Sequence, residues 1–108
     1  MLLKTRQLIL EKAGHTVVTC TDEPSILRAC RQYAFDVAVV GHRMQSKLER
    51  RFVSFFRENC PSARILELYV ASTGKQLEDA DAWLEVPVDI PQQFADRVTE
   101  LAAPKTKS

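Results

Sequence analysis

The order of apolar and polar residues divides the chain into segments with two different periods. In most of the longer segments apolar residues recur at three- and four-residue spacings, the pattern of a helix with one buried face. Between them lie short runs rich in β-branched residues, which are typical of strands. We expect helices at residues 1–13, 21–33, 46–59, 75–79 and 91–102. We expect strands at residues 15–20, 36–41, 64–70 and 82–86.

Glycine and proline support these boundaries. Gly14 is placed to end the first helix, Pro61 prevents the third from continuing, and Pro87 stops the last strand. The strand at 36–41 is almost wholly apolar, as expected of a parallel strand covered by helices on both faces. The strand at 64–70 has one exception, Glu67, in its middle.

Strict alternation of helices and strands predicts a three-layer α/β/α sandwich around a parallel sheet of four strands. We expect one domain over residues 1–103 and a disordered polar tail at 104–108. In such sheets sites form beyond the carboxyl ends of the strands. The loops at 20–24, 41–46, 69–74 and 86–90 are therefore the candidate site.

Composition narrows the function classes. The chain has 108 residues, of which 45% are hydrophobic and 27% charged, typical of a globular domain. It has no apolar run long enough to span a membrane and no secretory signal pattern, so we expect a cytoplasmic protein. Cys20, Cys30 and Cys60 form no C-x-x-C pair, and we interpret Cys20 and Cys30 as small buried apolar residues. We expect no metal site and no cofactor.

Four stretches resemble the receiver domains of response regulators in two-component signalling, and together they cover nearly the whole chain. They are residues 8–17, 35–44, 61–66 and 80–88. The resemblance implies a flavodoxin-like fold whose strand order is 2-1-3-4-5. Here the chain begins at the family's first helix, so the first strand is missing.

The resemblance also identifies positions at which this chain departs from a working receiver. Gly41 stands where the family has its phosphoacceptor aspartate, Tyr69 where it has a threonine or serine, and Val86 where it has a lysine. The acidic pair that holds Mg²⁺ is absent together with the first strand. Three neighbours do not replace these groups. His42 would lack the metal, the lysine and the hydroxyl. Asp36 lies at the opposite end of its strand, and Glu85 should point to the other face of the sheet. We therefore expect no phosphotransfer and no Mg²⁺ site.

One further position of the family bears on partners. Trp83 corresponds to its aromatic switch residue, and we interpret the ring as a fixed anchor. The usual output surface of the family corresponds to a possible interaction face at Trp83, Glu85, Pro87 and Asp89.

The missing strand leaves three possibilities open. Another chain fills its place, by strand swapping or by sheet augmentation. Alternatively, the strand at 15–20 moves over and pairs with the strand at 36–41. The third possibility is that Met1 is not the natural start and the strand lies upstream.

The leading hypothesis is a non-enzymatic, unphosphorylated receiver-like module that binds a protein partner or itself, as a homodimer or strand-swapped dimer. One alternative is a conventional phosphorelay receiver in the natural full-length product. Another is nucleic-acid binding through the basic segment 43–57, which contains Arg43, Lys47, Arg50, Arg51 and Arg57. No recognition motif accompanies these residues, which disfavours nucleic acid as a partner.

Overall fold

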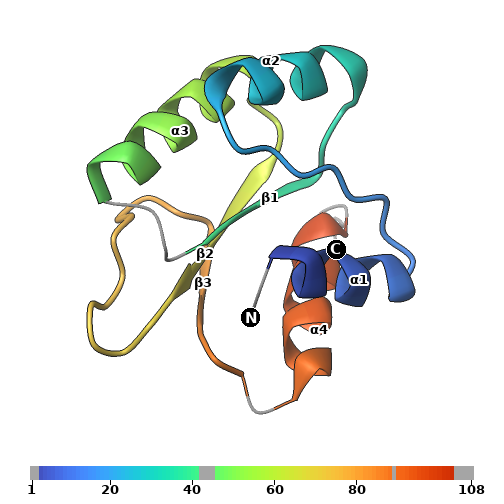
Figure 1. The fold of residues 1–108 in the computed structure, drawn as a ribbon, viewed down its shortest axis with the longest axis vertical. Coiled ribbons are helices and arrows are strands. Elements are labelled where there is room, and N and C mark those ends of the chain that lie inside the picture. The colour runs from blue at the N-terminus through green and yellow to red at the C-terminus, as the bar shows by residue number, and fades with distance from the viewer. Residues whose placement is uncertain (1–2, 42–45, 89, 104–108) are drawn as a thin grey trace, which may run out of the picture.

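A computed structural model describes residues 3–41, 46–88 and 90–103, and within them the chain forms an α/β structure (Figure 1). Its helices are α1 (Leu3–Lys12), α2 (Glu23–Gln32), α3 (Ser46–Asn59) and α4 (Pro91–Ala102). Its strands are β1 (Val37–Val40), β2 (Arg64–Tyr69) and β3 (Ala82–Glu85). The strands pair in parallel in the order β1-β2-β3. Helices cover both faces of the sheet, α1 and α4 on one side and α2 and α3 on the other.

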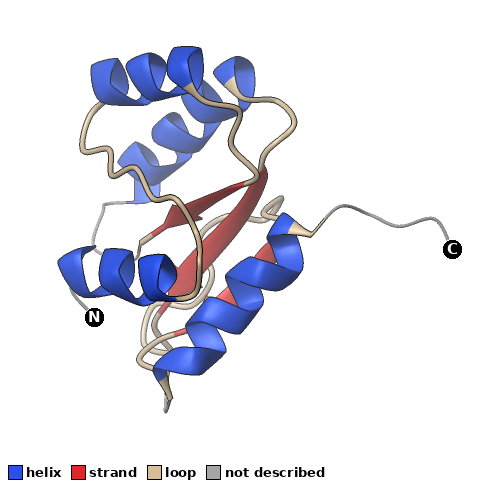
Figure 2. Ribbon diagram, turned by 90° about the vertical axis from the view of Figure 1, so that its right-hand side faces the viewer, coloured by secondary structure: helices blue, strands red, loops and turns tan. Residues whose placement is uncertain are grey.

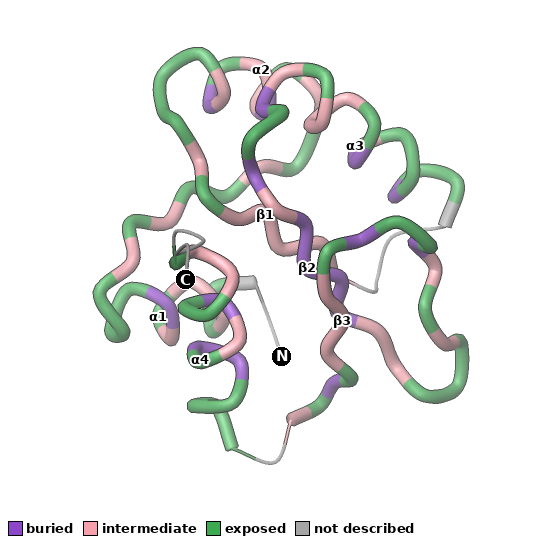
Figure 3. Tube along the Cα trace, turned by 180° about the vertical axis from the view of Figure 1, so that it is seen from behind, coloured by how far each residue is buried: buried purple, intermediate pink, exposed green. Residues whose placement is uncertain are grey.

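The central strand β2 supplies the core on both faces, because successive side chains of a strand point in opposite directions. Leu66 and Leu68 are fully buried in a cluster with Leu10 of α1 and Phe94 of α4. Ile65 points to the other face and packs with Val53 of α3 and the loop before β3. Figure 3 shows β2 as the most deeply buried strand, with β1 only partly buried beside it.

The start of α2 is fixed by a reciprocal cap that the sequence encodes locally. The Asp22 carboxylate accepts a hydrogen bond from the backbone N–H of Ser25 at 2.9 Å, and the Ser25 hydroxyl accepts one from Asp22 N–H at 3.2 Å. A proline follows in the first turn, where its missing N–H costs no hydrogen bond. Each of these contacts satisfies a donor that the helix itself cannot pair.

The predicted strand at 15–20 is wrong. This segment runs as irregular backbone between α1 and α2, so the described part of the chain has three strands instead of the expected four. Within that part, no backbone hydrogen bond to other backbone is formed by residues 16–20. The physical reason is that a strand exists only when paired, and in the described structure no neighbouring segment pairs with residues 15–20.

The predicted short helix at 75–79 is also wrong. Residues 71–80 form turns and irregular backbone. The N–H groups of Gln76 and Leu77 donate to the Glu67 carboxylate instead of to backbone carbonyls. A side chain of β2 thus takes the place of the first helical hydrogen bonds.

The remaining helices and strands lie within about two residues of the predicted ranges, the usual scatter at element ends. The polar tail at 104–108 and the first two residues lie outside the described residues. No helix in the described ranges combines the length and apolarity that crossing a membrane requires.

Candidate functional site

The three positions that align with the phosphoryl site of receiver domains lie at the carboxyl ends of the three strands. Gly41 follows β1, Tyr69 ends β2, and Val86 follows β3. The Val86 N–H donates to the Tyr69 carbonyl at 2.7 Å, which holds the ends of β2 and β3 together. The parallel sheet therefore gathers these backbone positions, as expected of carboxyl ends.

The side chains at this edge do not converge. Val86 is buried with Phe94 in the core between the sheet and α4. Tyr69 lies beneath the Lys75 ammonium, which is 5.8 Å from its ring centre and 4.8 Å from that of Trp83, on the opposite face. Glu85 is exposed. No nucleophile, base and cation of the described residues meet at this edge.

An arginine fills the space beside Gly41. A Cβ built on Gly41 would lie 2.6 Å from Nη1 of Arg6, closer than two such atoms can approach. The φ angle of Gly41 is not positive, so the backbone does not require glycine there. An aspartate at residue 41 would therefore force the Arg6 guanidinium to move.

Trp83 is held from two sides. Its ring N–H donates to the Leu77 carbonyl at 2.9 Å, and its ring packs against the cluster formed by Ile65, Val53 and Leu77. Lys75 covers the outer part of the ring through a cation–π contact. Of the predicted interaction face, Glu85 and Pro87 are exposed and Asp89 lies outside the described residues.

Two carboxyl groups are buried together between α3 and β2. Glu49 and Glu67 are each 1% exposed. The Glu67 oxygens accept hydrogen bonds from the N–H groups of Gln76 and Leu77 at 2.9–3.1 Å. The Oε1 atom of Glu49 has no hydrogen-bond partner among the described residues. A buried carboxylate that lacks a donor is costly, which favours the protonated form of Glu49.

Burial, and secondly the charge of Glu67, raises the pKa of Glu49 to about 7. The neighbouring Arg50 opposes this change and lowers it. No group of three or more His, Cys, Asp or Glu side chains gathers in the described ranges. One sign of this pair is visible in the sequence, the lone acid Glu67 inside an apolar strand.

A groove of about 840 Å³ lies along the open edge of β1. It is lined by residues 14–21, by β1 and by side chains of all four helices, and we call it the edge groove. Figure 2 shows the loop between α1 and α2 crossing in front of the sheet on this side. Among the five large apolar residues that are exposed, Val18, Tyr33 and Leu48 line the groove.

Both walls of the edge groove carry backbone that lacks strand partners. Strand β1 pairs with β2 on one edge only. Facing it, residues 16–20 form no backbone hydrogen bond to other backbone. An added strand can bind at such a place, because it hydrogen-bonds to the unpaired N–H and C=O groups and packs its side chains on the apolar surface.

The basic residues of 43–57 are partly engaged within the chain. Arg51 pairs with Glu23 at 2.7 Å, and Arg57 donates to the Asp79 carbonyl at 2.7 Å. Lys47 and Arg50 are exposed on α3, and Arg43 lies outside the described residues. The helix therefore does not present a continuous row of arginines to a polyanion.

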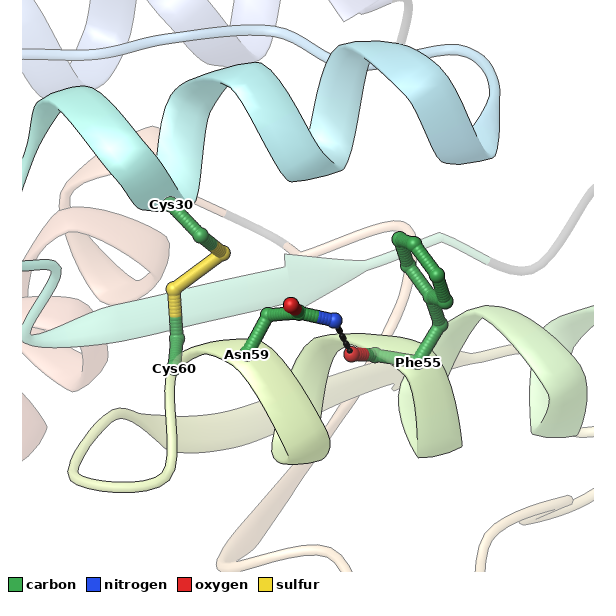
Figure 4. Close-up of a disulfide and its surroundings, with 4 residues drawn as sticks. All are labelled: Cys30, Phe55, Asn59 and Cys60. Carbon is green, nitrogen blue, oxygen red and sulfur yellow. Dashed lines mark hydrogen bonds between the residues drawn. A yellow bond between two sulfur atoms is a disulfide. The ribbon is translucent and has the colours of Figure 1, made fainter.

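The interpretation of Cys30 as a free apolar residue is wrong. Cys30 near the end of α2 and Cys60 just after α3 form a disulfide, with α-carbons 5.8 Å apart (Figure 4). The topology explains the pairing: α2 leads into β1 and α3 into β2, and parallel strands begin at the same edge of a sheet. The corresponding ends of the two helices therefore meet. Cys20 is free and half-buried.

The buried acid pair predicts that stability falls as the pH rises. The pKa of Glu49 is raised in the folded chain, so its stabilising effect is fully present below the unfolded value of about 4.3. It is lost as the pH rises through about 7, where Glu49 ionises beside Glu67. We expect the urea midpoint to fall between about pH 4.5 and pH 7 and to level off above about pH 7.5.

The substitution Glu49→Gln should remove most of this pH dependence, because an amide of nearly the same shape does not ionise. Glu58→Gln, on an exposed position of the same helix, is the matched control and should keep the wild-type profile. Parallel profiles for wild type and Glu49→Gln would contradict the proton assignment.

Comparison of the chain with protein-family models, with curated proteins and with solved structures finds no match. The resemblance to receiver domains therefore rests on the four sequence stretches and on the order of helices and strands. The geometry of the edge groove and of the strand ends at Gly41, Tyr69 and Val86 does not depend on that resemblance.

Proposed function

We propose that this chain is a protein-interaction module with a receiver-like, flavodoxin-like fold that carries out no phosphotransfer. Its binding site is the edge groove, and its ligand is an extended segment of a partner protein that adds to the sheet beside β1. The observation that carries the proposal is the open edge of β1, which faces a second unpaired segment across an apolar groove. Like receivers, the module is proposed to act in the cytoplasm.

The lining of the groove selects an apolar, extended ligand. Val37 and Val39 face the α4 side, Ala38 and Val40 face the α3 side, and all four are only partly buried. A segment with β-branched residues would cover both sets at once, because its side chains alternate in the same way. Main-chain hydrogen bonds to β1 would supply the register.

Charge at the two ends of β1 selects the direction of the segment. Asp36 precedes the strand, and the Arg6 guanidinium lies beside Gly41 at its other end. Both existing strand pairs are parallel. A parallel segment that complements these charges has a basic residue at its amino end and an acidic residue at its carboxyl end.

The family resemblance supports the same site. In the order 2-1-3-4-5, the first strand lies between the counterparts of residues 15–20 and β1, which are the two walls of the edge groove. An interaction module also agrees with the residues at the sheet edge, where Gly41, Tyr69 and Val86 replace the groups that phosphoryl transfer needs.

The groove can be tested with a synthetic peptide that has lysine first, then a run of valine and isoleucine, then aspartate. We expect saturable binding by calorimetry, with a negative heat-capacity change from apolar burial. A peptide of reversed sequence, which has the same composition, should bind at least about tenfold more weakly. In the parallel direction its charges oppose Arg6 and Asp36, and it can match them only as an antiparallel strand, which neither existing strand pair is.

Two matched variants locate the binding. Val18→Lys introduces a charge into the groove at a position that is 38% exposed, and should weaken binding about tenfold or more. Leu8→Lys introduces the same charge at a 54% exposed position that does not line the groove, and should bind as wild type. Equal binding by both variants would refute the site. A chain that dimerises alone, and loses this with Val18→Lys, would show that the ligand is a second copy.

The absence of phosphotransfer has its own test. After incubation with a small phosphodonor and Mg²⁺, intact mass should show no gain of about 80 Da, the mass of one phosphoryl group. A receiver with an intact site serves as the positive control. An adduct on this chain would restore the conventional phosphorelay alternative.

A further inference from the structure

Helix α2 depends on α3 for its position. It packs against α3, and among the described elements it makes no comparably extensive contact with the sheet or with the other helices. Figure 1 shows α2 lying with α3 on the outer side of the sheet. Yet Ile26 and Ala29 of α2 are buried and line the edge groove, so α2 forms part of its wall.

Two links fasten α2 to α3, one near each end. Near the start of α2, Glu23 accepts from the Arg51 side chain, which is 72% exposed. An ion pair so open to water holds a helix weakly. Near the other end lies the Cys30–Cys60 disulfide (Figure 4). The covalent bond is thus the stronger of the two.

We propose that Cys30 and Cys60 form a redox site that controls the edge groove: oxidation fixes α2 against α3, and reduction releases it. The regulatory part rests on the proposed function of the groove, whereas the redox part stands on the placement of the two cysteines. In the oxidised chain Ile26 and Ala29 complete the wall, and the extended ligand binds. In the reduced chain the wall loosens, and binding weakens.

A small thiol such as glutathione can reduce the Cys30–Cys60 disulfide in a balanced exchange. Reduction breaks the Cys30–Cys60 bond with two electrons and two protons from two glutathione molecules, which leave as one glutathione disulfide. Oxidation is the reverse exchange. Cys30 is half-buried, so a small thiolate can reach it from solvent, whereas Cys60 is 8% exposed. In a cytoplasmic protein such a bond is more often responsive than permanent.

The third cysteine does not compete for this exchange. Cys20 lines the edge groove and is half-buried. Burial is the main cause that raises the pKa of its thiol, which keeps the nucleophilic thiolate scarce. Cys20 therefore serves as an internal reference, because it remains a thiol in both states.

The test begins by counting thiols in the whole chain. The protein is equilibrated with glutathione disulfide or with excess reduced glutathione, denatured at low pH, and alkylated. We expect one alkyl group after oxidation and three after reduction, read by intact mass. Three groups in the oxidised sample, or a Cys20 adduct in place of the intramolecular bond, would overturn the redox site.

Hydrogen exchange then measures what the bond does. In the reduced chain we expect amides of α2 to exchange at least tenfold faster than in the oxidised chain, with α4 unchanged. Cys20→Ser should reproduce the wild-type difference, and the Cys30→Ser/Cys60→Ser variant should match the reduced chain in both buffers. Reduced wild type also lacks the Cys30–Cys60 bond. The test therefore remains decisive even if the double variant folds poorly. Equal exchange of α2 in both states would refute its release.

Peptide affinity separates this inference from the proposed function. Weaker binding of the lysine-first peptide by the reduced chain supports both. Binding of equal strength in both states overturns the control of the groove and leaves the docking function intact. If α2 exchange responds to redox state but the peptide binds neither form, the docking function fails and the redox site stands.

Discussion

Backbone pairing along β1 governs the structure. A strand in the interior of an α/β sandwich needs hydrogen-bonding neighbours on both edges, because helices above and below exclude much of the water that would otherwise serve. Here β2 supplies one neighbour, and the other edge opens onto the edge groove. The irregular course of residues 16–20 follows directly, since these residues face the same gap and have no strand to join. The open edge of β1 and the irregular backbone of residues 16–20 thus go together, because no strand of the described structure lies between them.

A second constraint acts on the other side of the sheet, where an acid replaces an apolar residue. Glu67 is buried in the middle of β2, and a buried carboxylate must be satisfied by donors. Two backbone N–H groups of the loop before β3, those of Gln76 and Leu77, supply them. The loop is thereby held over Trp83 as irregular backbone, where the sequence pattern predicts a helix. The need to hydrogen-bond the buried Glu67 carboxylate has thus outweighed the helical preference of residues 75–79.

These two cases show how far the sequence determines the fold. Helices such as α3 and strands such as β2 follow from periodicity and breakers, because those signals act within a few residues. The segment at 15–20 has the composition of a strand whether or not a partner is present, so composition could not reveal the missing pairing. Glu67 was visible as an anomaly, but its partner Glu49 lies on another element. The pairing of Cys30 with Cys60 could have been inferred from topology, since both lie where a helix ends and a strand begins.

The site illustrates the same division between backbone and side chains. Parallel topology brings Gly41, Tyr69 and Val86 to one edge of the sheet, as the sequence predicts, but the pleat then sends Tyr69 and Val86 to opposite faces. A catalytic site needs its groups to converge on one reacting atom, and alternation prevents that here. Binding an extended segment makes the opposite demand, because a strand presents side chains to both faces and backbone to its edge. The edge groove offers surfaces to both faces and to the edge of such a segment, which is the geometry that the proposed docking role requires.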